Sequence, residues 1–461
     1  MNWAPTTVEG WGRVKQAHML ACAPRSSEEA QTALRASDGR GLIAHGAGRS
    51  YGDAALNDGG RALMTRGMGR ILAFDADNGE VICEPGVSFR QLLDTLLPRG
   101  FLAPVTPGTG FASLGGAVAH DVHGKNHEVA GSFGDHVRWM DLLLPEGRIV
   151  RVDPQRQPVL FAATLGGLGL TGIILRVAFG MQAVPSNAVR LRERRIRNLD
   201  EFLAAFAGET PSFSVGWLDG MARGAQLGRG ILETAELSDI SVPLSPTRNL
   251  AVPCNLPGWV LNSWTVQAFN SVYFRRVPAG GRERLLALQR FLYPLDAVSD
   301  WNRMYGRRGF YQFQCVLPEA ESPRGLPRLL ETIADARAAS FLAVLKRMGG
   351  AGRGYLSFPM RGHTLALDFP ARAGTRALLQ RLETITLEHG GRVYLAKDAS
   401  LSAQTCRAMY PDIDVFRDVL DRIDPEGRMN SDLARRLDIR GHAFAAKHRH
   451  RPVVATTAAT D

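Results

Sequence analysis

The stretch His45-Gly46-Ala47-Gly48-Arg49-Ser50-Tyr51-Gly52-Asp53 follows a short apolar run, residues 41–45, that is predicted to be a strand. Its closely spaced glycines permit tight turns with positive φ angles and leave successive backbone N–H groups uncovered. Such a run of amides can cradle a pyrophosphate, so the stretch predicts an anion-binding loop. It is not a G-x-G-x-x-G motif, because Tyr51 occupies the position of the third glycine.

A second glycine-rich region occupies residues 107–127. It contains Pro107-Gly108-Thr109-Gly110 and Ser113-Leu114-Gly115-Gly116-Ala117, followed by His120-Asp121-Val122-His123-Gly124-Lys125-Asn126-His127. Small side chains allow the backbone to lie close to a ligand, which predicts a second ligand-binding segment. The three histidines match no common zinc pattern with its closing ligand, so no metal site is expected.

The hexapeptide Gly167-Leu168-Gly169-Leu170-Thr171-Gly172 satisfies the G-x-G-x-x-G pattern of dinucleotide-binding proteins. That pattern requires a following helix whose N-terminus points at the phosphates. The residues that follow here, Ile173-Ile174-Leu175-Arg176-Val177, are apolar and partly β-branched, as is typical of a strand. A doubly wound dinucleotide-binding sheet is therefore not predicted.

The composition is that of a globular protein, with 45% apolar and 22% charged residues among 461. This length predicts two or three domains. The five cysteines are odd in number and form no C-x-x-C pair, so neither a disulfide framework nor a zinc site is expected. A reducing, cytoplasmic location fits this pattern, and the first residues lack the basic flank and apolar core of a signal peptide.

The net charge of +10 comes partly from a basic stretch between residues 435 and 451. A solvated tail is its simplest interpretation, and contact with anionic lipid headgroups stays open. No nucleic-acid module accompanies it, so nucleic acid is not an expected partner. Residues 249–274 are uncharged and aromatic, but prolines and Gly258 interrupt them, so they are not expected to span a membrane.

Short helices and strands alternate without a strict βαβ repeat, which predicts an α+β fold. Helices are predicted at residues 27–35, 88–97, 282–291 and 326–340, and strands at 79–84, 137–144, 148–152, 172–179, 213–218, 310–317 and 365–369. The chain is expected to divide into an N-terminal domain (1–185), a mixed domain with an antiparallel sheet (186–390), a C-terminal segment returning to the first domain (391–440) and a basic tail (441–461).

The order of these motifs resembles the vanillyl-alcohol-oxidase, or PCMH-type, family of FAD-binding oxidoreductases. The likeness continues through Trp301-Asn302-Arg303-Met304-Tyr305-Gly306, Ala396-Lys397-Asp398 and Ser431-Asp432-Leu433-Ala434-Arg435-Arg436-Leu437, so it covers nearly the whole chain. It implies a PCMH-type, two-subdomain FAD-binding domain followed by a substrate domain.

The resemblance implies non-covalent FAD, because Arg49 stands where some relatives have a histidine linked to the flavin. The implied FAD-binding residues are Ala44, His45, Gly46, Ala47, Gly48, Arg49, Ser50, Tyr51, Gly52, Asp53, Ala54, Gly108, Ser113, Leu114, Gly115, Gly116, His120, Asp121, Val122, His123, Ile174 and Tyr394.

Within this family, the motifs are most similar to those of enzymes that oxidise the ribose 2-hydroxyl of a polyprenyl-phosphate ribose to the 2-keto sugar, the first half of an epimerisation to the arabinose donor. Lys397 and His123 are the implied catalytic residues, and the sequence does not choose between them as the base. The implied substrate-binding residues are Tyr51, Trp217, Tyr305, Gln312, Gln314, Lys346 and Lys397. A separate NAD(P)-dependent reductase and peripheral contact with the inner face of a membrane are implied partners.

Three alternatives stay open. An FAD-dependent sugar or alditol oxidase using O₂ and a soluble carbohydrate would share the fold, as would a binding protein that has lost the flavin. The segment 248–276 could cradle a prenyl chain or be a buried connection packed on the second domain.

Overall fold

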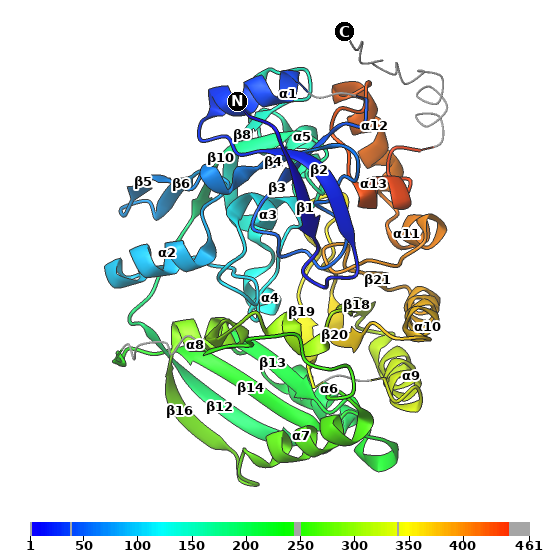
Figure 1. Ribbon diagram of the computed structural model, residues 1–461. Helices are drawn as coiled ribbons and strands as arrows, with labels where there is room; N and C mark the ends of the chain where they lie inside the picture. Colours follow the sequence, from blue (N-terminus) through cyan, green and yellow to red (C-terminus); the bar gives the residue numbers. More distant parts are fainter. Residues whose placement is uncertain (1, 37–38, 244–249, 339–340, 442–461) are drawn as a thin grey trace.

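The computed structural model describes residues 2–36, 39–243, 250–338 and 341–441 (Figure 1). The predicted α+β class is confirmed, because short helices alternate with sheets that are mostly antiparallel. Of the predicted basic tail, all but Gly441 lies outside the described residues.

Two sheets form the N-terminal part, in the upper half of Figure 1. In the first, of order β1-β2-β4-β3, the strands β2 and β3 both run parallel to β4. The second, of order β5-β6-β10-β8-β9, is antiparallel throughout. The strands are β1 (Ala4–Glu9), β2 (Gln16–Cys22), β3 (Leu42–His45), β4 (Arg61–Met64), β5 (Ile71–Asp75), β6 (Glu80–Cys83), β8 (Val137–Leu143), β9 (Ile149–Val152) and β10 (Ile173–Gly180).

An eight-stranded antiparallel sheet of order β16-β12-β14-β13-β19-β20-β18-β21 forms the lower half of Figure 1. Its strands are β12 (Ala188–Ile196), β13 (Phe213–Leu218), β14 (Gly230–Leu237), β16 (Arg282–Ala287), β18 (Phe310–Pro318), β19 (Ala343–Met348), β20 (Gly362–Pro370) and β21 (Arg392–Val393). Two short ladders pair β7 (Phe101–Leu102) with β11 (Gln182–Ala183) and β15 (Leu250–Ala251) with β17 (Val298–Ser299). The chain passes from the N-terminal sheets to the eight-stranded sheet between Ala183 and Ala188, and β21 extends the eight-stranded sheet just past residue 390. The domain boundaries stay predictions from the sequence.

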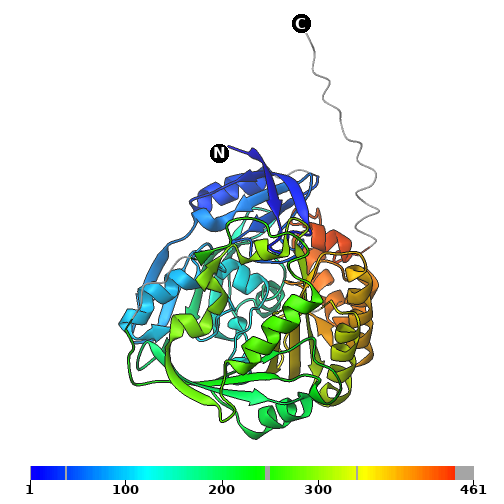
Figure 2. The same ribbon diagram turned by 60° about the horizontal axis from the view of Figure 1, so that its bottom comes forward.

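Helices lie on the outer faces of these sheets and also between the two halves of the molecule (Figures 1 and 2). They are α1 (Ser27–Arg35), α2 (Phe89–Leu96), α3 (Leu114–Ala119), α4 (His127–Ala130), α5 (Pro158–Thr164), α6 (Leu199–Gly208), α7 (Ser263–Arg275), α8 (Leu288–Leu292), α9 (Ser322–Asp335), α10 (Thr375–Glu388), α11 (Ala403–Met409), α12 (Ile413–Ile423) and α13 (Asp432–Arg436). The helix predicted at 27–35 matches α1, whose N-cap Ser26 accepts a hydrogen bond from the Glu29 amide. One apolar cluster contains buried side chains from both halves of the molecule, so the two parts share a core.

The helix predicted at residues 282–291 is wrong over most of its length. Arg282–Ala287 form strand β16, which pairs with β12, and only Leu288–Leu292 are helical. The pairing brings Arg282 and Arg284 to Glu193, whose carboxylate is fully buried, at N–O distances of 2.6 and 3.0 Å. Pairing across the sheet therefore overrides the helical preference of these residues.

Residues 250–275 do not form a buried connection. Their main element is α7, which packs on the molecule through Val266 and Asn270, and the Asn270 amide donates to Asp219. Its outer face is apolar and open to solvent, with Trp264 83% and Val272 71% exposed. The prediction that this segment is a buried connection is therefore wrong for its described residues.

The predicted failure of the Gly167–Gly172 fingerprint is confirmed, because strand β10 follows it and not a helix. Gly172 has φ +148°, and a Cβ atom there would lie 2.4 Å from the Leu143 carbonyl oxygen. A side chain would therefore force β10 away from β8, which gives this glycine a role in sheet packing.

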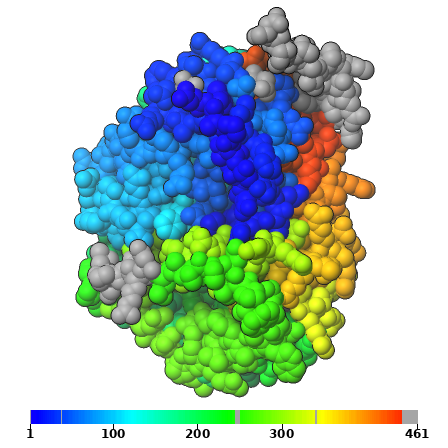
Figure 3. Space-filling view, viewed as in Figure 1, coloured from blue at the N-terminus to red at the C-terminus, as the bar shows by residue number. Residues whose placement is uncertain are grey.

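The loop at the tip of the N-terminal hairpin reaches the second domain, as the dark blue and light green surfaces in Figure 3 show. The Asn302 amide donates to the Trp11 carbonyl (3.2 Å), and Arg13 donates to Asn255 (2.5 Å). The Phe310 amide donates to the Gly12 carbonyl at 2.7 Å. The hairpin therefore covers part of the junction between the two domains.

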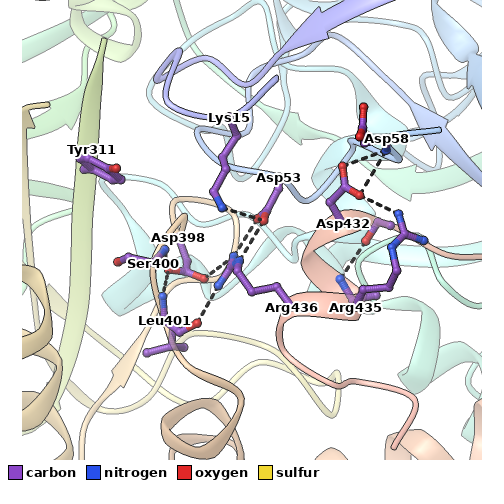
Figure 4. Close-up of polar contacts among 12 residues, drawn as sticks. Lys15, Asp53, Asp58, Tyr311, Asp398, Ser400, Leu401, Asp432, Arg435 and Arg436 are labelled. Atoms are coloured by element: carbon purple, nitrogen blue, oxygen red, sulfur yellow. Dashed lines mark hydrogen bonds and ion pairs between the residues drawn. The ribbon is translucent and has the colours of Figure 1, made fainter. Parts of the chain in front are cut away.

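The C-terminal segment returns to the first domain through α13 and ends in an ionic cluster (Figure 4). Arg436 binds the Asp53 carboxylate with two nitrogens at 2.8 and 2.7 Å, and it donates to Asp398 at 2.9 Å. Lys15 lies 3.7 Å from the same Asp53 carboxylate. Four segments distant in sequence thus meet in this cluster, and both carboxylate partners of Arg436 are buried.

We predict that Arg436→Met lowers the free energy of unfolding by about 3–5 kcal/mol, because it leaves two buried carboxylates without their partner. The control variant Arg407→Met, in α11, removes an exposed pair with Asp414 and should have a much smaller effect, because exposed ion pairs contribute little to stability. Urea unfolding followed by circular dichroism measures both. Equal midpoints for the two variants would contradict the proposed importance of Arg436.

Candidate active site

A cavity of about 590 Å³ lies where the glycine-rich loops face the eight-stranded sheet. Its walls come from both domains and from the returning C-terminal segment. The predicted FAD-binding residues that line it are Ala44, Gly46, Ala47, Gly48, Arg49, Ser50, Tyr51, Ala54, Gly108, Ser113, Gly115, Gly116, His120, Val122, His123, Ile174 and Tyr394, and the predicted substrate-binding residues that line it are Tyr51, Trp217, Gln312, Gln314, Lys346 and Lys397.

The glycine wall is shaped to admit a ligand close to the backbone. A Cβ atom at Gly46 would lie 2.4 Å from Ser113 Oγ, and Gly48 has φ +65°. A Cβ atom at Gly108 would meet no heavy atom of the described residues within 4 Å, so this position opens onto the cavity. The loops fit the narrow cradle that an extended cofactor with a pyrophosphate requires.

Polar atoms without partners point to a polar occupant. Among the described residues, the buried Arg49 Nε, His120 Nδ1 and His123 Nδ1 have no hydrogen-bond partner. The Arg49 guanidinium lies 4.2 Å from the Trp11 ring centroid, which holds it in place without neutralising its charge. Because buried polar groups are normally paired, these atoms are suited to bind a cofactor.

Lys397 lines the cavity, with its Nζ 3.9 Å from the Tyr51 ring centroid. Burial lowers the pKa of this ammonium group to about 8, although nearby Asp368 opposes the shift. Burial in turn raises the pKa of Asp368 to about 7. Lys397 is therefore a lysine whose proton is exchangeable near neutral pH.

Asp368 supports this wall from behind. Its two oxygens accept hydrogen bonds from Gln312 Nε2 at 2.6 Å and from the Tyr305 hydroxyl at 3.1 Å. Tyr305 itself does not line the cavity, because its ring is stacked on Phe310 at 4.2 Å between centroids. The expected contact of Tyr305 with substrate is thus replaced by a contact with the carboxylate that holds Gln312.

His123 occupies the same wall as a neutral imidazole. Burial lowers its pKa well below the ordinary value, and the charges of Lys346, His127 and Lys397 add to this. Gln314 Nε2 lies 2.9 Å from His123 Nε2 and donates to Thr364 Oγ1 at 3.1 Å. With Nε2 accepting from Gln314, the ring carries its proton on Nδ1, which faces no protein partner among the described residues.

Five other predicted residues lie behind the lining. Leu114 is core, and His45 Nδ1 bonds the Ala55 carbonyl at 3.1 Å. Asp121 accepts hydrogen bonds from the Gly134 amide and from Ser357, and burial raises its pKa to about 6. Gly52 and Asp53 face the returning segment, where a Cβ atom at Gly52 would lie 1.9 Å from the Asp398 carbonyl oxygen. These residues shape the loops and do not line the cavity.

Sequence reasoning missed Asp368 as a member of the site. A carboxylate in the apolar run Thr364-Leu365-Ala366-Leu367-Asp368-Phe369 was the available signal, because such a group is rarely buried without a partner. It also gave Lys125, Trp11 and Tyr273 no role, although all three line the cavity. Lys125 lies in the second glycine-rich region and Tyr273 in the segment 248–276, but the pattern of neither segment singled out these side chains, because their contacts depend on elements distant in sequence.

Two features are absent from the part of the chain that the structure describes. No group of three or more His, Cys, Asp or Glu side chains is placed to hold a metal ion. In the same part of the chain, no helix has the length and apolar character needed to cross a bilayer.

Comparisons with known proteins match this arrangement. The FAD binding domain family matches residues 20–153, and the D-arabinono-1,4-lactone oxidase family matches residues 307–437. The decaprenylphosphoryl-β-D-ribose oxidase of Mycolicibacterium smegmatis is 35% identical over 94% of this chain and 98% of its own length. An uncharacterised protein of Streptomyces coelicolor is 33% identical over 77% of this chain and all of its own, and a D-lactate dehydrogenase of Anaerostipes hadrus is 30% identical over 30% of each chain.

We predict that Asp368→Asn shifts the titration of Lys397 to lower pH, because the carboxylate raises the pKa of that lysine and the amide cannot. Competitive acetylation of lysines across pH, read by mass spectrometry, reports the titration of Lys397. Glu383→Gln, which removes another buried carboxylate outside the cavity lining, is the matched control and should leave Lys397 unchanged. An unshifted midpoint in Asp368→Asn would contradict the electrostatic coupling.

Proposed function

The chain belongs to the decaprenylphosphoryl-β-D-ribose oxidase family, and we propose that it oxidises the ribose 2-hydroxyl of a polyprenyl-phosphate ribose to the 2-keto sugar. It is an FAD-dependent oxidoreductase that acts on CH–OH groups. The observation that carries the proposal is the convergence of Lys397, His123, Gln312 and Gln314 on a cavity whose opposite wall is the glycine-rich cradle. Epimerisation of the sugar would begin with this oxidation.

The glycine wall would hold FAD without a covalent bond. Arg49 supplies a cation whose Nε has no partner among the described residues, and the Ser50 hydroxyl, 3.1 Å from His120 Nε2, adds a polar edge. Burial and the charge of Lys397 lower the pKa of His120 to about 4, so its ring is neutral at pH 7. When bound, FAD supplies the hydride-accepting chemistry, and the protein supplies position and proton transfer.

The sugar end of the substrate would lie against β18 and Lys397. Gln312 and Gln314 are two residues apart on one strand, so both amides face the cavity. We favour Lys397 as the group that takes the hydroxyl proton, since burial lowers its pKa towards neutrality. His123, which already accepts a hydrogen bond from Gln314, would then orient the hydroxyl through its Nδ1 proton.

A soluble sugar or sugar lactone is the second candidate substrate, because the D-arabinono-1,4-lactone oxidase family matches residues 307–437. The two candidates predict different products. Oxidation of a soluble carbohydrate with release of hydrogen peroxide supports the second candidate, and flavin reduction only by a polyprenyl-phosphate ribose supports the first. The intact cradle and lysine-lined cavity count against a binding protein without flavin.

We predict that Lys397→Met retains FAD but slows flavin reduction by farnesylphosphoryl-β-D-ribofuranose at least about 100-fold, the usual range for loss of a general base. Lys397→Arg, which keeps the charge but not a proton exchangeable near neutral pH, should be equally slow. Stopped-flow absorbance at the flavin bands measures the rate, and acid precipitation should leave the flavin in the supernatant. A normal rate in Lys397→Met overturns the catalytic role.

The proposed product and the lipid of the proposed substrate imply two further partners, a reductase and a membrane. A 2-keto sugar must receive a hydride to complete epimerisation, so a separate NAD(P)-dependent reductase would act next. The cytoplasmic location stays a prediction from the sequence. The proposed substrate also carries a lipid, which requires the site to be reached from a membrane.

We propose that the α7 surface, defined by Trp259, Trp264, Phe269 and Val272, rests on an anionic lipid surface. The side chain of Trp259, just before α7, is 74% exposed, and that of Trp264, on α7, is 83% exposed. Neighbouring apolar side chains with such exposure are typical of a surface that contacts a partner. Cations flank this surface, since Arg372 donates to the Gly258 and Leu261 carbonyls and Arg275 is exposed at the end of α7. Aromatic and basic side chains together are typical of interfacial membrane contacts.

The inner side of this surface leads to the cavity. Phe269 stacks on Tyr273 at 5.6 Å between centroids, and Tyr273 lies 4.6 Å from Trp217. Tyr273 and Trp217 both line the cavity. This chain of aromatic rings would let a prenyl chain remain near the membrane while its sugar enters the site.

We predict that the double substitution Trp259→Ser and Trp264→Ser weakens binding to vesicles of phosphatidylglycerol and phosphatidylcholine about tenfold, because interfacial binding scales with buried apolar area. Val415→Ser, at an exposed apolar position on α12, should bind like the unmodified protein. Vesicle co-sedimentation measures this. Equal binding by all three proteins would contradict the α7 assignment.

A further inference from the structure

Three lysine side chains from three separate segments line the same cavity. Lys125 lies in the second glycine-rich region, Lys346 lies on β19, and Lys397 follows β21. Lys346 Nζ donates to the Gly124 carbonyl at 3.4 Å. Lys125 Nζ donates to the Phe291 carbonyl at 2.5 Å and lies 4.1 Å from the Phe291 ring centroid. The first two ammonium groups are therefore anchored by neutral atoms.

Among the described residues, no carboxylate forms a salt bridge with these lysines, although Asp368 acts on Lys397 and Glu233 acts on Lys125 from a greater distance. Within the described ranges, none of the three ammonium groups lies within 4.0 Å of an Asp or Glu oxygen. The carboxylates that do line the cavity are engaged elsewhere: Glu233 pairs with Arg276 at 3.0 Å, Asp300 pairs with Arg303 at 3.3 Å, and Asp296 accepts from Thr109 and the Gly110 amide. The cavity thus holds an excess of positive charge.

The excess of positive charge is unfavourable in a buried cavity when no anion is bound. Burial, followed by the charges of Lys397 and Lys125, lowers the pKa of Lys346 to about 7. Burial also lowers the pKa of Lys125. Like charges in a site of low polarity disfavour one another, and a bound anion relieves both costs.

The sheet order places Lys346 between two parts of the cavity. Strand β19 lies between β13, which carries Trp217, and β20, beyond which β18 carries Gln312 and Gln314. Trp217 pairs in register with Val344, two residues before Lys346 on the same strand. Moving across the sheet, one therefore meets an aromatic side chain, then the ammonium group, then the two amides.

We infer that Lys346 and Lys125 form a subsite for the phosphodiester of the substrate. The inference rests on the proposed function and specifies its substrate class, because a free sugar has no group for this subsite. A polyprenyl-phosphate sugar consists of lipid, phosphate and sugar in that order, which matches the order of Trp217, Lys346 and the two glutamines across the sheet. Lysine binds phosphate as a compact point charge without requiring a bidentate geometry.

The other phosphate that this cavity would contain is the pyrophosphate of FAD. Among the described residues, the hydrogen bonds of Lys125 and Lys346 go to Phe291 and Gly124, and neither goes to the glycine loop at residues 46–50. Arg49 is the cation of that loop. The flavin pyrophosphate and the substrate phosphate are thus assigned to different cations.

The subsite should be sensitive to pH. The groups that face Lys346 are Lys125 and Lys397 from the neighbouring loops, His123 and His127 from the first domain, Glu233 beside Lys125 and Asp368 behind Lys397. The protonated lysine binds an anion, and the lysine loses its proton as pH rises through its pKa of about 7. Affinity for the phosphate should therefore fall as pH increases from 6.5 to 8.5, with proton uptake on binding.

Isothermal titration calorimetry of the FAD-loaded enzyme with farnesyl phosphate and with farnesol tests the subsite independently of turnover. We expect farnesyl phosphate to bind at least tenfold more tightly than farnesol. Lys346→Met should remove most of this difference, and Lys346→Arg should retain it. Arg361→Met removes an exposed cation near the same sheet and should bind farnesyl phosphate normally.

Two calorimetric results and one measurement of flavin content would contradict the subsite. Equal affinity of farnesyl phosphate and farnesol, or unchanged farnesyl phosphate affinity in Lys346→Met, overturns the subsite. Loss of FAD from Lys346→Met, measured by flavin absorbance per protein, would assign the lysine to the cofactor and also overturn it. Failure of the proposed function is a separate result, because it is read from flavin reduction by farnesylphosphoryl-β-D-ribofuranose and not from calorimetry.

Discussion

The hydrogen bonds of Arg436 to Asp53 and Asp398 hold the active site together. Asp53 ends the first glycine loop, and Asp398 directly follows Lys397. A backbone hydrogen bond from the Tyr51 amide to the Ala396 carbonyl, 3.0 Å long, joins the same two segments. The Lys397 ammonium group lies over the Tyr51 ring because these contacts fix both segments, so one arginine in the C-terminal helix sets the geometry of residues far from it in sequence.

The cavity itself combines two kinds of wall. The glycine-rich wall offers backbone N–H groups and the cation Arg49. The other wall offers the side-chain amides of two glutamines, lysines and a neutral histidine. Burial lowers the pKa values of Lys346, Lys397 and His123. The shift suits Lys397 to proton transfer near neutral pH and keeps the His123 ring neutral, whereas at Lys346 a bound anion would oppose the shift. Asp368 limits the shift at Lys397 while it holds Gln312 in place.

Much of the fold could be predicted where the pattern was local. The helix at 27–35 and strand β13 have the predicted bounds, because capping and alternation are properties of neighbouring residues. Residues 282–287 could not be predicted from local preference, since their strand depends on pairing with β12 and on the buried carboxylate of Glu193. The carboxylate of Asp368 in an apolar run was a local signal, but its role depends on Tyr305 and Gln312, which come from other segments.

The sequence by itself determined the glycine-rich loops, the rejection of a Rossmann fold at residues 167–172 and the resemblance that implied FAD. These three conclusions follow from short motifs and their order along the chain, because the conformation of each motif depends on its own neighbouring residues. Only the tertiary structure decided which residues line the cavity, that Tyr305 lies behind it, and that three lysines share it without forming a salt bridge to a carboxylate of the described residues. Burial and charge proximity depend on which distant segments meet, and no local pattern encodes that meeting.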